Sequence, residues 1–529
     1  MSKTNNLSQR LTTSQRSTEF LISKLDTHFS CLIGGLAMPL CFAPFNFSWL
    51  CFLALLPLLV ACRHPNPDIR VLRGFLFGFG YFCIGSYWFA ETLITHISYS
   101  WPAALGGHLL ITGACALAPT VFCWLSGYLY NNIAGQTPQA KKLRAFFWPL
   151  FLAALWVLIE DIRFQAFGGG PWMSLGLSQI DSPIRGFIPI LGEVGTSGIV
   201  IGLSELLLTT LYAINRGQLK KSVLVGSLVT VIVLGAHFLS MIEWTENTGA
   251  PLAIAMVQTA VSQRDKKDLS KQTQRLSQLS ELSRPYLGKA KFIIWPETVV
   301  TLNRGDIDQA LSELGKQAMF ARTSILVGAY ESTLNNTRFN TAFTLGYEGG
   351  QKYKKRHLVP FGEYVPNYLW FLTDYVPGDQ NRSLGRDAML IANSGTLFGV
   401  SICWEGSFSR DNNPLVRAGA HVLVNIANEA WFAGSSLPKQ NLDAMRLRAL
   451  ETGRPVIRVA NYGPGAIIDP NGKITTSLQA DIANSAMGYV QPRVGTTPFL
   501  IVGADFILFC SFAIVLIICI ILKRAGPRI

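Results

Sequence analysis

Long apolar runs constrain this chain more than any other feature. A membrane-spanning helix needs about 20 mostly apolar residues, and eight segments approach that length. Seven of them precede residue 243 and one follows residue 498, so the 256 residues between hold no spanning run. We therefore expect a helical membrane bundle carrying one large domain outside the bilayer. The expected spans are 30–46, 48–62, 72–94, 102–130, 146–160, 187–214, 222–242 and 499–522, the first two and the fifth being short.

Basic residues predict the orientation of these spans, because Lys and Arg concentrate in cytoplasmic loops. With the N-terminus inside, the inner segments hold 16 Lys and Arg residues, whereas the short outer loops hold only Arg163 and Arg185. We expect both termini in the cytoplasm and 243–498 on the periplasmic side of a bacterial inner membrane. The polar segment 1–28 shows no cleavable signal peptide and is expected to be a cytoplasmic tail, as is 523–529. The spans would then fill 29–242 and 499–522.

The net charge of +13 does not indicate a nucleic-acid partner. Residues 243–498 contain 27 of the 45 basic and 22 of the 32 acidic residues, which leaves them a net charge of only +5. Most of the basic excess is therefore an orientation signal facing anionic lipid. No basic stripe with interleaved aromatic residues is present, so binding of DNA or RNA is not expected.

The stretch 243–498 is predicted to be a layered α/β domain. Short apolar runs, typical of strands, alternate with stretches of helical periodicity. The expected strands are 291–295, 324–328, 342–345, 396–402 and 421–425, and the expected helices are 266–283, 306–322 and 439–453.

The distribution of cysteine points to one residue. Nine of the ten cysteines lie in or beside the spans, where cysteine behaves as a small apolar residue; Cys403 is the tenth. It follows the expected strand 396–402 and is either a buried structural thiol or a nucleophile. A nucleophile needs a base and an oxyanion stabiliser. Glu297, after a strand, and the basic run 354–356 could supply them, although each alone is equally compatible with a solvated loop.

Three motifs in this order resemble the nitrilase superfamily. They are Trp295-Pro296-Glu297, the run from Lys355 through His357-Leu358-Val359-Pro360-Phe361-Gly362 to Glu363, and Cys403-Trp404-Glu405. On a domain inserted before the last of eight spans, they resemble the apolipoprotein N-acyltransferase family, and this resemblance covers nearly the whole chain.

The resemblance implies an αββα sandwich and a ping-pong acyl transfer. Cys403 would be the nucleophile, Glu297 the general base, and Lys355 the cation that stabilises the oxyanion. Glu363 and Glu405 would position Lys355 and hold the charge balance of the site. The reaction needs no metal and no organic cofactor, and no His/Cys cluster with metal-ligand spacing occurs in the sequence.

The resemblance also implies the partners. The acyl donor would be a phospholipid, typically phosphatidylethanolamine, and the acceptor a diacylglyceryl apolipoprotein; the protein is expected to be a monomer among membrane lipids. Trp172, Trp404 and Trp431 could line a lipid path, or could equally be ordinary interface or core residues.

Three positions depart from the family pattern. Lys267 stands where tryptophan is usual, Trp404 where tyrosine is common, and Asn441 where histidine is frequent. They bear on acyl-chain and headgroup preference, which the sequence does not define.

Two other classes remain open. A membrane-tethered amidase would use the same triad with water as the acceptor. A transporter or lipid-binding protein would carry an inert outer domain, and its pathway would use the intramembrane carboxylates Glu193, Glu205 and Asp505. The alternative for these three is that they lie near span ends or pair with neighbouring cations.

Overall fold

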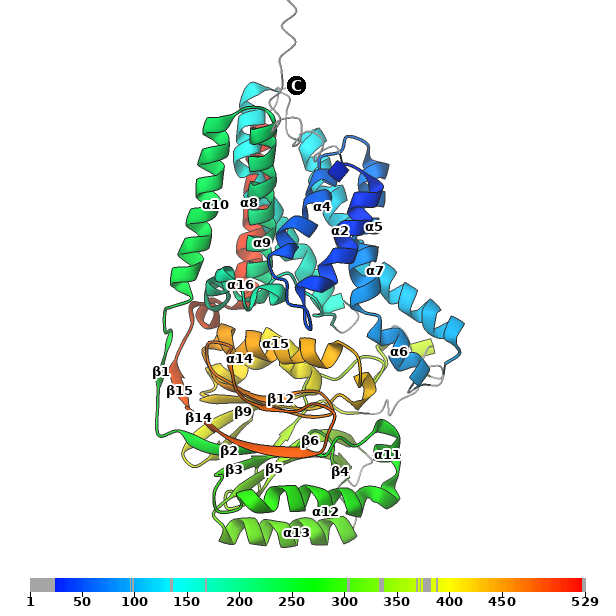
Figure 1. The fold of residues 1–529 in the computed structure, drawn as a ribbon, viewed down its shortest axis with the longest axis vertical. Helices are drawn as coiled ribbons and strands as arrows, with labels where there is room; N and C mark the ends of the chain where they lie inside the picture. The colour runs from blue at the N-terminus through cyan, green and yellow to red at the C-terminus, as the bar shows by residue number, and fades with distance from the viewer. Residues whose placement is uncertain are drawn as a thin grey trace, which may run out of the picture.

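The computed structural model describes residues 24–525, except 96, 98, 134–136, 167–168, 302–304, 333–336, 368–369, 372, 374–381 and 387–388. Most of the expected N-terminal tail and the last four residues therefore lie outside the described residues. A helical half stands on an α/β domain (Figure 1). The helical half contains α2 (His28–Ala37), α3 (Leu50–Ala54), α4 (Leu56–Ala61), α5 (Pro67–Gly85), α6 (Trp88–Thr95), α7 (Trp101–Tyr128), α8 (Pro138–Gln165), α9 (Ile188–Asn215), α10 (Leu219–Leu239) and α16 (Pro498–Arg524).

The apolar helices differ in length from the expected spans. Among the described residues, five are long and apolar enough to cross a membrane, and α5 with α6, bent by 47°, qualifies as a sixth. The expected spans 30–46 and 48–62 form only shorter apolar helices, so by helix length the prediction of eight full spans is not met. The span expected at 146–160 is wrong in length: α8 runs for 28 residues. Its polar first turns, capped by Thr137, extend the helix beyond the apolar core.

Two β-sheets form the centre of the α/β domain. The seven-stranded sheet has the order β14 (Asn484–Val490), β2 (Leu252–Gln258), β3 (Phe292–Ile294), β5 (Ser324–Ser332), β6 (Arg338–Gly346) and β7 (Lys352–Lys354), with β4 (Val300–Thr301) also paired to β5. The six-stranded sheet has the order β13 (Ile474–Leu478), β12 (Gly465–Ile468), β11 (Val456–Asn461), β10 (Val422–Asn428), β9 (Thr396–Ile402) and β8 (Leu390–Asn393). β1 (Thr245–Asn247) and β15 (Arg493–Gly495) pair separately.

The two sheets pack face to face through alternate apolar side chains. Phe398, Val400 and Ile402 of β9 point to the inner face, and the ring of Phe398 lies 5.1 Å from that of Phe292. Helices α12 (Gln272–Ser283) and α13 (Gly305–Phe320) cover the outer face of the seven-stranded sheet. Helices α14 (Ser409–Arg417) and α15 (Leu437–Thr452) cover the other sheet and lie beneath the membrane helices (Figure 1). The predicted αββα sandwich beside a helical bundle is confirmed.

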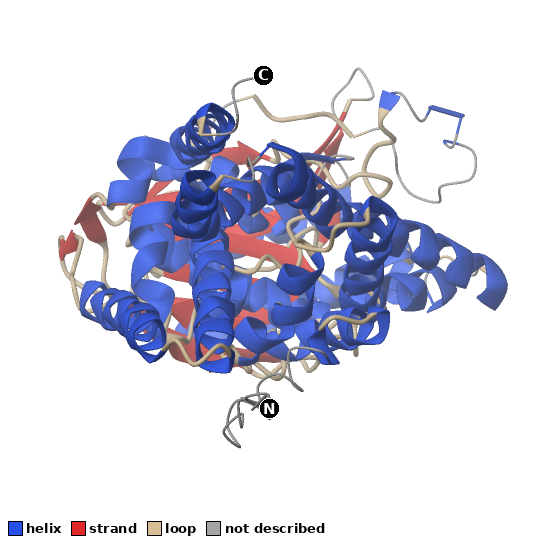
Figure 2. Cartoon of the chain, turned by 90° about the horizontal axis from the view of Figure 1, so that it is seen from above, coloured by secondary structure: helices blue, strands red, loops and turns tan. Residues whose placement is uncertain are grey.

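The strand directions bring the functional segments to one edge. β9, β10 and β11 are parallel to one another, as are β2, β3 and β5 in the other sheet. Since parallel strands share the edge at their carboxyl ends, the residues after β3 and β9 can meet there. Seen from above, helices lie over the strands (Figure 2), so the sandwich sits beneath the helical half.

The intramembrane carboxylates pair with cations. Glu193 pairs with Arg448 of α15, Glu205 with Arg63, and Asp505 with Arg410. This agrees with the expectation that the three carboxylates pair with neighbouring cations. None of the three is left as a free carboxylate that could line a transport pathway.

Candidate active site

Lys355 is a buried cation held between two carboxylates. It follows β7, and its side chain is only 1% exposed. Its Nζ lies 2.8 Å from Oε2 of Glu363 and 3.6 Å from Oε1 of Glu297. Burial opposes the charge, but the two carboxylates outweigh it and raise the pKa of Lys355 above its usual range. The ammonium is therefore charged throughout the physiological range.

Glu297 is fixed by both sheets. It follows β3 after Trp295, whose buried indole donates a hydrogen bond to Ser283 at 2.9 Å and so anchors the turn. Oε1 of Glu297 accepts from Nδ2 of Asn340 at 2.6 Å, and Oε2 accepts from the backbone N–H of Asn428 at 2.7 Å. The carboxylate thus has one partner from each sheet, which sets its orientation toward the gap between their edges.

Cys403 lies at a sharp turn after β9. Its φ of 53° is left-handed, and it begins the 3₁₀ turn Cys403–Ser407. Nδ2 of Asn425 on β10 donates to the Cys403 carbonyl at 3.2 Å. Burial raises the pKa of the thiol, the Glu297 carboxylate raises it further, and the Lys355 ammonium opposes this. Cys403 is therefore a protonated thiol that must lose its proton to act as a nucleophile.

Glu363 and Glu405 occupy different places around Lys355. Glu363 contacts the lysine directly and also accepts from the Val359 N–H at 2.9 Å. Burial opposes ionisation of Glu363, but Lys355 and the hydrogen bonds hold its pKa below the ordinary value. Glu405 is fully buried and binds backbone instead. It accepts from the N–H groups of Arg356 at 2.5 Å and Ile402 at 2.6 Å, next to Lys355 and Cys403 respectively.

Glu405 is consequently a bridge between the lysine segment and the cysteine turn. Both its oxygens also accept from the Tyr353 hydroxyl at 2.9 Å. Burial raises the pKa of Glu405 to about 6, against the backbone hydrogen bonds that favour the charged form.

A second buried network lies behind Cys403 and is not evident from the sequence. Glu429, directly after β10, is paired with Arg458 of β11 at 2.5 Å and accepts from Nδ2 of Asn441 at 2.6 Å. Arg458 in turn donates to Asn425 at 2.6 Å, the residue that binds the Cys403 carbonyl. Burial raises the pKa of Glu429. The only sequence signal is a polar run ending an apolar strand, since the members come from separate elements.

A second lysine faces the Glu297 turn. Nζ of Lys266, in α11 (Gln263–Lys267), donates to the Glu297 carbonyl at 3.2 Å and contacts the Thr298 hydroxyl. Burial lowers the pKa of Lys266 to about 7, although the Glu297 carboxylate favours its charge. The side chain of Lys267 is outside the described part of the chain.

Tryptophans connect the site to the helical half. The ring of Trp404 lies 5.0 Å from Trp172, which lies 5.1 Å from Trp88 of α6. Arg163 of α8 donates to the Trp172 carbonyl at 2.9 Å and so holds its loop. Trp431, in the next turn, accepts at its carbonyl from Thr92 of α6 at 3.1 Å. Trp172 therefore lies between α6 and the Trp404 ring of the Cys403 turn, and Trp431 contacts α6 directly.

Within the described residues, no group of three or more His, Cys, Asp and Glu side chains is arranged to hold a metal. The chemical groups present are a protonated thiol, a positioned carboxylate and a buried ammonium. This set suits nucleophilic attack on a carbonyl with stabilisation of the oxyanion. The αββα fold with these groups at its strand ends defines a carbon–nitrogen hydrolase type of enzyme, carried here on apolar helices.

Comparison with known proteins specifies the family. Residues 34–206 match the model "Apolipoprotein N-acyltransferase N-terminal domain", and residues 253–497 match "Carbon-nitrogen hydrolase". The apolipoprotein N-acyltransferase of Methylococcus capsulatus is 31% identical over 89% of this chain and 92% of its own. That of Azotobacter vinelandii is 32% identical over 89% and 90%, and that of Haemophilus influenzae 28% identical over 91% and 92%.

The chain belongs to the apolipoprotein N-acyltransferase family. The family resemblance found in the three motifs is confirmed, and with it the prediction of a membrane-associated acyltransferase of lipoprotein maturation.

Proposed function

We propose that this protein transfers an acyl chain from a phospholipid, through a thioester on Cys403, to the N-terminal amine of a diacylglyceryl-cysteine apolipoprotein. The observation that carries the proposal is the placement of the protonated Cys403 thiol in the field of the Glu297 carboxylate and the Lys355 ammonium. Both substrates are lipid-anchored, and the layer of α14 and α15 lies directly beneath the membrane helices (Figure 1).

In the first half-reaction Glu297 takes the thiol proton as the Cys403 sulfur attacks the ester carbonyl. Lys355 stabilises the negative oxygen of the tetrahedral intermediate. When the intermediate collapses, the ester C–O bond breaks and Glu297 returns the proton to the leaving alcohol oxygen. The products are an acyl-cysteine thioester and a lysophospholipid.

In the second half-reaction the acceptor amine attacks the thioester carbonyl. Glu297 takes a proton from the attacking nitrogen, Lys355 again stabilises the oxyanion, and the C–S bond breaks. The proton then returns to the departing sulfur, which restores the Cys403 thiol and leaves an amide. Glu363 holds Lys355 in place, and Glu405 fixes the backbone on which Lys355 and Cys403 stand.

The proposal also specifies the acyl donor, the oligomeric state and the membrane in which the protein works. The donor is phosphatidylethanolamine, and the protein works as a monomer in a bacterial inner membrane with 243–498 on the periplasmic side. The excess of Lys and Arg in the inner segments supports this orientation. Trp172, Trp404 and Trp431 line the approach of the acyl chain from α6.

Incubation of the purified protein with radiolabelled phosphatidylethanolamine tests the mechanism. The wild type should form a hydroxylamine-sensitive acyl adduct, and Cys403→Ser, Glu297→Gln and Lys355→Ala should each lower it by at least about a hundredfold. The matched controls are Cys510→Ser, Glu281→Gln and Lys354→Ala, of which Lys354 stacks on Phe339 beside the site; all should retain the adduct.

Two outcomes would contradict the proposal. Full adduct in Glu297→Gln or Lys355→Ala would remove their assigned roles. Release of free fatty acid without adduct and without an amine acceptor would instead identify a hydrolase that uses the same triad.

A further inference from the structure

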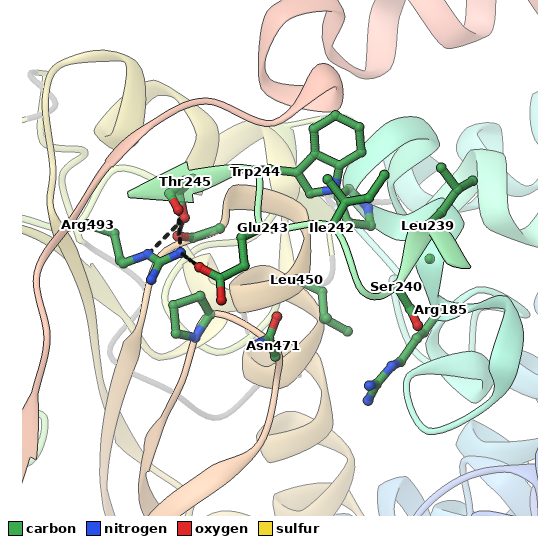
Figure 3. Close-up of a pocket in the computed structure, with 14 residues that line it drawn as sticks. Arg185, Leu239, Ser240, Ile242, Glu243, Trp244, Thr245, Leu450, Asn471 and Arg493 are labelled. Carbon is green, nitrogen blue, oxygen red and sulfur yellow. Dashed lines mark hydrogen bonds and ion pairs between the residues drawn. The ribbon is translucent and has the colours of Figure 1, made fainter. Parts of the chain in front are cut away.

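A cavity lies on the opposite side of the molecule from α6, where the helical half meets the α/β domain. It has a volume of about 630 Å³ and is bordered by the end of α10, by the turn before α9 and by the turn between β12 and β13. A smaller pocket adjoins it and shares Arg185, Ser240, Glu243 and Asn471 (Figure 3).

Two cations in this cavity form no ion pair among the described residues. Its other charged residues are already satisfied: Arg446 binds Asp181 and Asp443, Glu243 pairs with Arg493 at 3.2 Å, and Asp469 accepts from two backbone N–H groups of its own turn. Among the described residues, neither the Arg185 guanidinium nor the Lys473 ammonium has a hydrogen-bond or ion-pair partner. They come from different halves of the molecule, so an anion between them would bridge the two.

An apolar surface leads into the same cavity. α10 is the least buried of the long apolar helices, since only 11% of its most apolar 18-residue stretch is buried. Its exposed side chains continue past the end of the helix to the cavity wall, through Val231 (64% exposed), Leu234 (50%), Phe238 (65%) and Met241 (62%). A ligand that reaches the two cations from the bilayer would therefore lay hydrocarbon along α10.

We propose that this cavity binds a phospholipid of the outer leaflet, with its phosphate diester on Arg185 and Lys473 and its hydrocarbon chains along α10. Arg185 precedes a spanning helix and Met241 follows one, which places the cations at headgroup level. A guanidinium forms paired hydrogen bonds with phosphate oxygens. The lipid is bound and not consumed, because the site lies apart from Cys403, and the inference does not depend on acyl transfer.

Photocrosslinking of the full-length protein in detergent micelles tests this site. The probe is a dialkyl-ether phosphatidylglycerol with a diazirine in one alkyl chain; lacking an ester, it cannot acylate Cys403. Peptide mapping should find label in residues 228–245 of the wild type. Arg185→Ala together with Lys473→Ala should lower that label about tenfold at sub-saturating probe, equivalent to about 1.4 kcal/mol. The control Lys289→Ala removes an exposed cation far from the cavity and should leave the label unchanged.

Competition experiments distinguish a phospholipid from free inorganic phosphate as the ligand of this site. Unlabelled dialkyl-ether phosphatidylglycerol should displace the probe, whereas inorganic phosphate at millimolar concentration should not. Displacement by inorganic phosphate at the same concentration as lipid would identify a site for free phosphate and overturn the lipid proposal. Equal label in the double variant and the wild type, or label confined to other helices, would also overturn it.

Discussion

At the scale of single residues, the site keeps its nucleophile neutral and its lysine charged. Burial raises the pKa of Cys403, so the free thiolate is scarce at rest. In the proposed mechanism, attack is therefore coupled to proton transfer to Glu297, whose carboxylate is held in position by hydrogen bonds from Asn340 and Asn428. A resting thiol is less exposed to oxidation than a thiolate.

Lys266 gives a pH-dependent prediction. Its pKa is about 7 in the folded protein because of burial, against about 10.4 in an unfolded chain. Between pH 7 and 10 the unfolded state binds more protons at this residue, so the free energy of unfolding rises with pH through that window. Replacing Lys266 by Met should remove this rise, which amounts to at most about 1.4 kcal/mol per pH unit.

The measurement is the apparent unfolding temperature in detergent micelles at pH 7 and pH 9. Lys289→Met, at an exposed position, should behave like the wild type. If Lys266→Met kept the full wild-type dependence on pH, the Lys266 ammonium would have to be charged and solvated in the folded state.

At the scale of elements, sequence patterns located the strands that carry motifs. The five expected strands correspond to β3, β5, β6, β9 and β10, and the three expected helices to α12, α13 and α15, with ends shifted by a few residues. The other ten strands were not predicted: β1, β2, β4, β7, β8 and β11 to β15. Apart from β2, which is apolar up to Gln258, their runs are short or interrupted, and they form strands by pairing with neighbouring strands of a sheet or ribbon.

The site was predictable to the extent that it lies in contiguous motifs. Glu297, Lys355 and Cys403 each belong to such a motif, and the structure brings their segments together, although their roles stay predictions. Asn340, Glu429 and Arg458 could not be found in this way. Each lies in a strand or directly after one, outside any recognisable motif, and only the pairing of distant strands makes it part of the site.

Gly328 of β5 sets how closely the strand approaches the Glu297 turn. A Cβ at this position would lie 2.3 Å from the carbonyl oxygen of Pro296 and 2.7 Å from Cα of Glu297. The obstacle is backbone, so Gly328→Ala must displace the turn. We expect adduct formation to fall about a hundredfold, since a displacement of about 1 Å can cost that much.

The control is Gly315→Ala in α13, where the new Cβ would lie 3.8 Å from the nearest atom, at Leu345. It should form adduct at the wild-type rate. Wild-type adduct formation by Gly328→Ala, in protein shown to be folded, would mean that the position of the Glu297 turn does not limit acylation.

At the scale of the whole molecule, a buried charge cluster joins the two halves. Arg448 of α15 is fully buried and pairs with Glu193 of α9 and, at 3.0 Å, with Glu451. The backbone N–H of Glu193 donates to Glu451 at 2.8 Å. Burial and the Glu193 charge raise the pKa of Glu451 to about 7, against the attraction of Arg448. Arg448 therefore compensates the negative charge of both buried carboxylates at this interface.

Arg448→Ala should therefore destabilise the protein by about 3–5 kcal/mol, because removing one partner leaves buried charges uncompensated. Differential scanning fluorimetry in micelles should show a lower unfolding temperature, and the linker at 240–250 should become more sensitive to protease as the halves separate. Lys439→Ala, on the exposed face of the same helix, should change neither.

Because the penalty comes from the orphaned carboxylates, adding Glu193→Gln and Glu451→Gln to an Arg448→Met variant should restore part of the loss. If the triple variant were less stable than Arg448→Met alone, the contribution of Arg448 would lie in packing or hydrogen bonding and not in charge compensation.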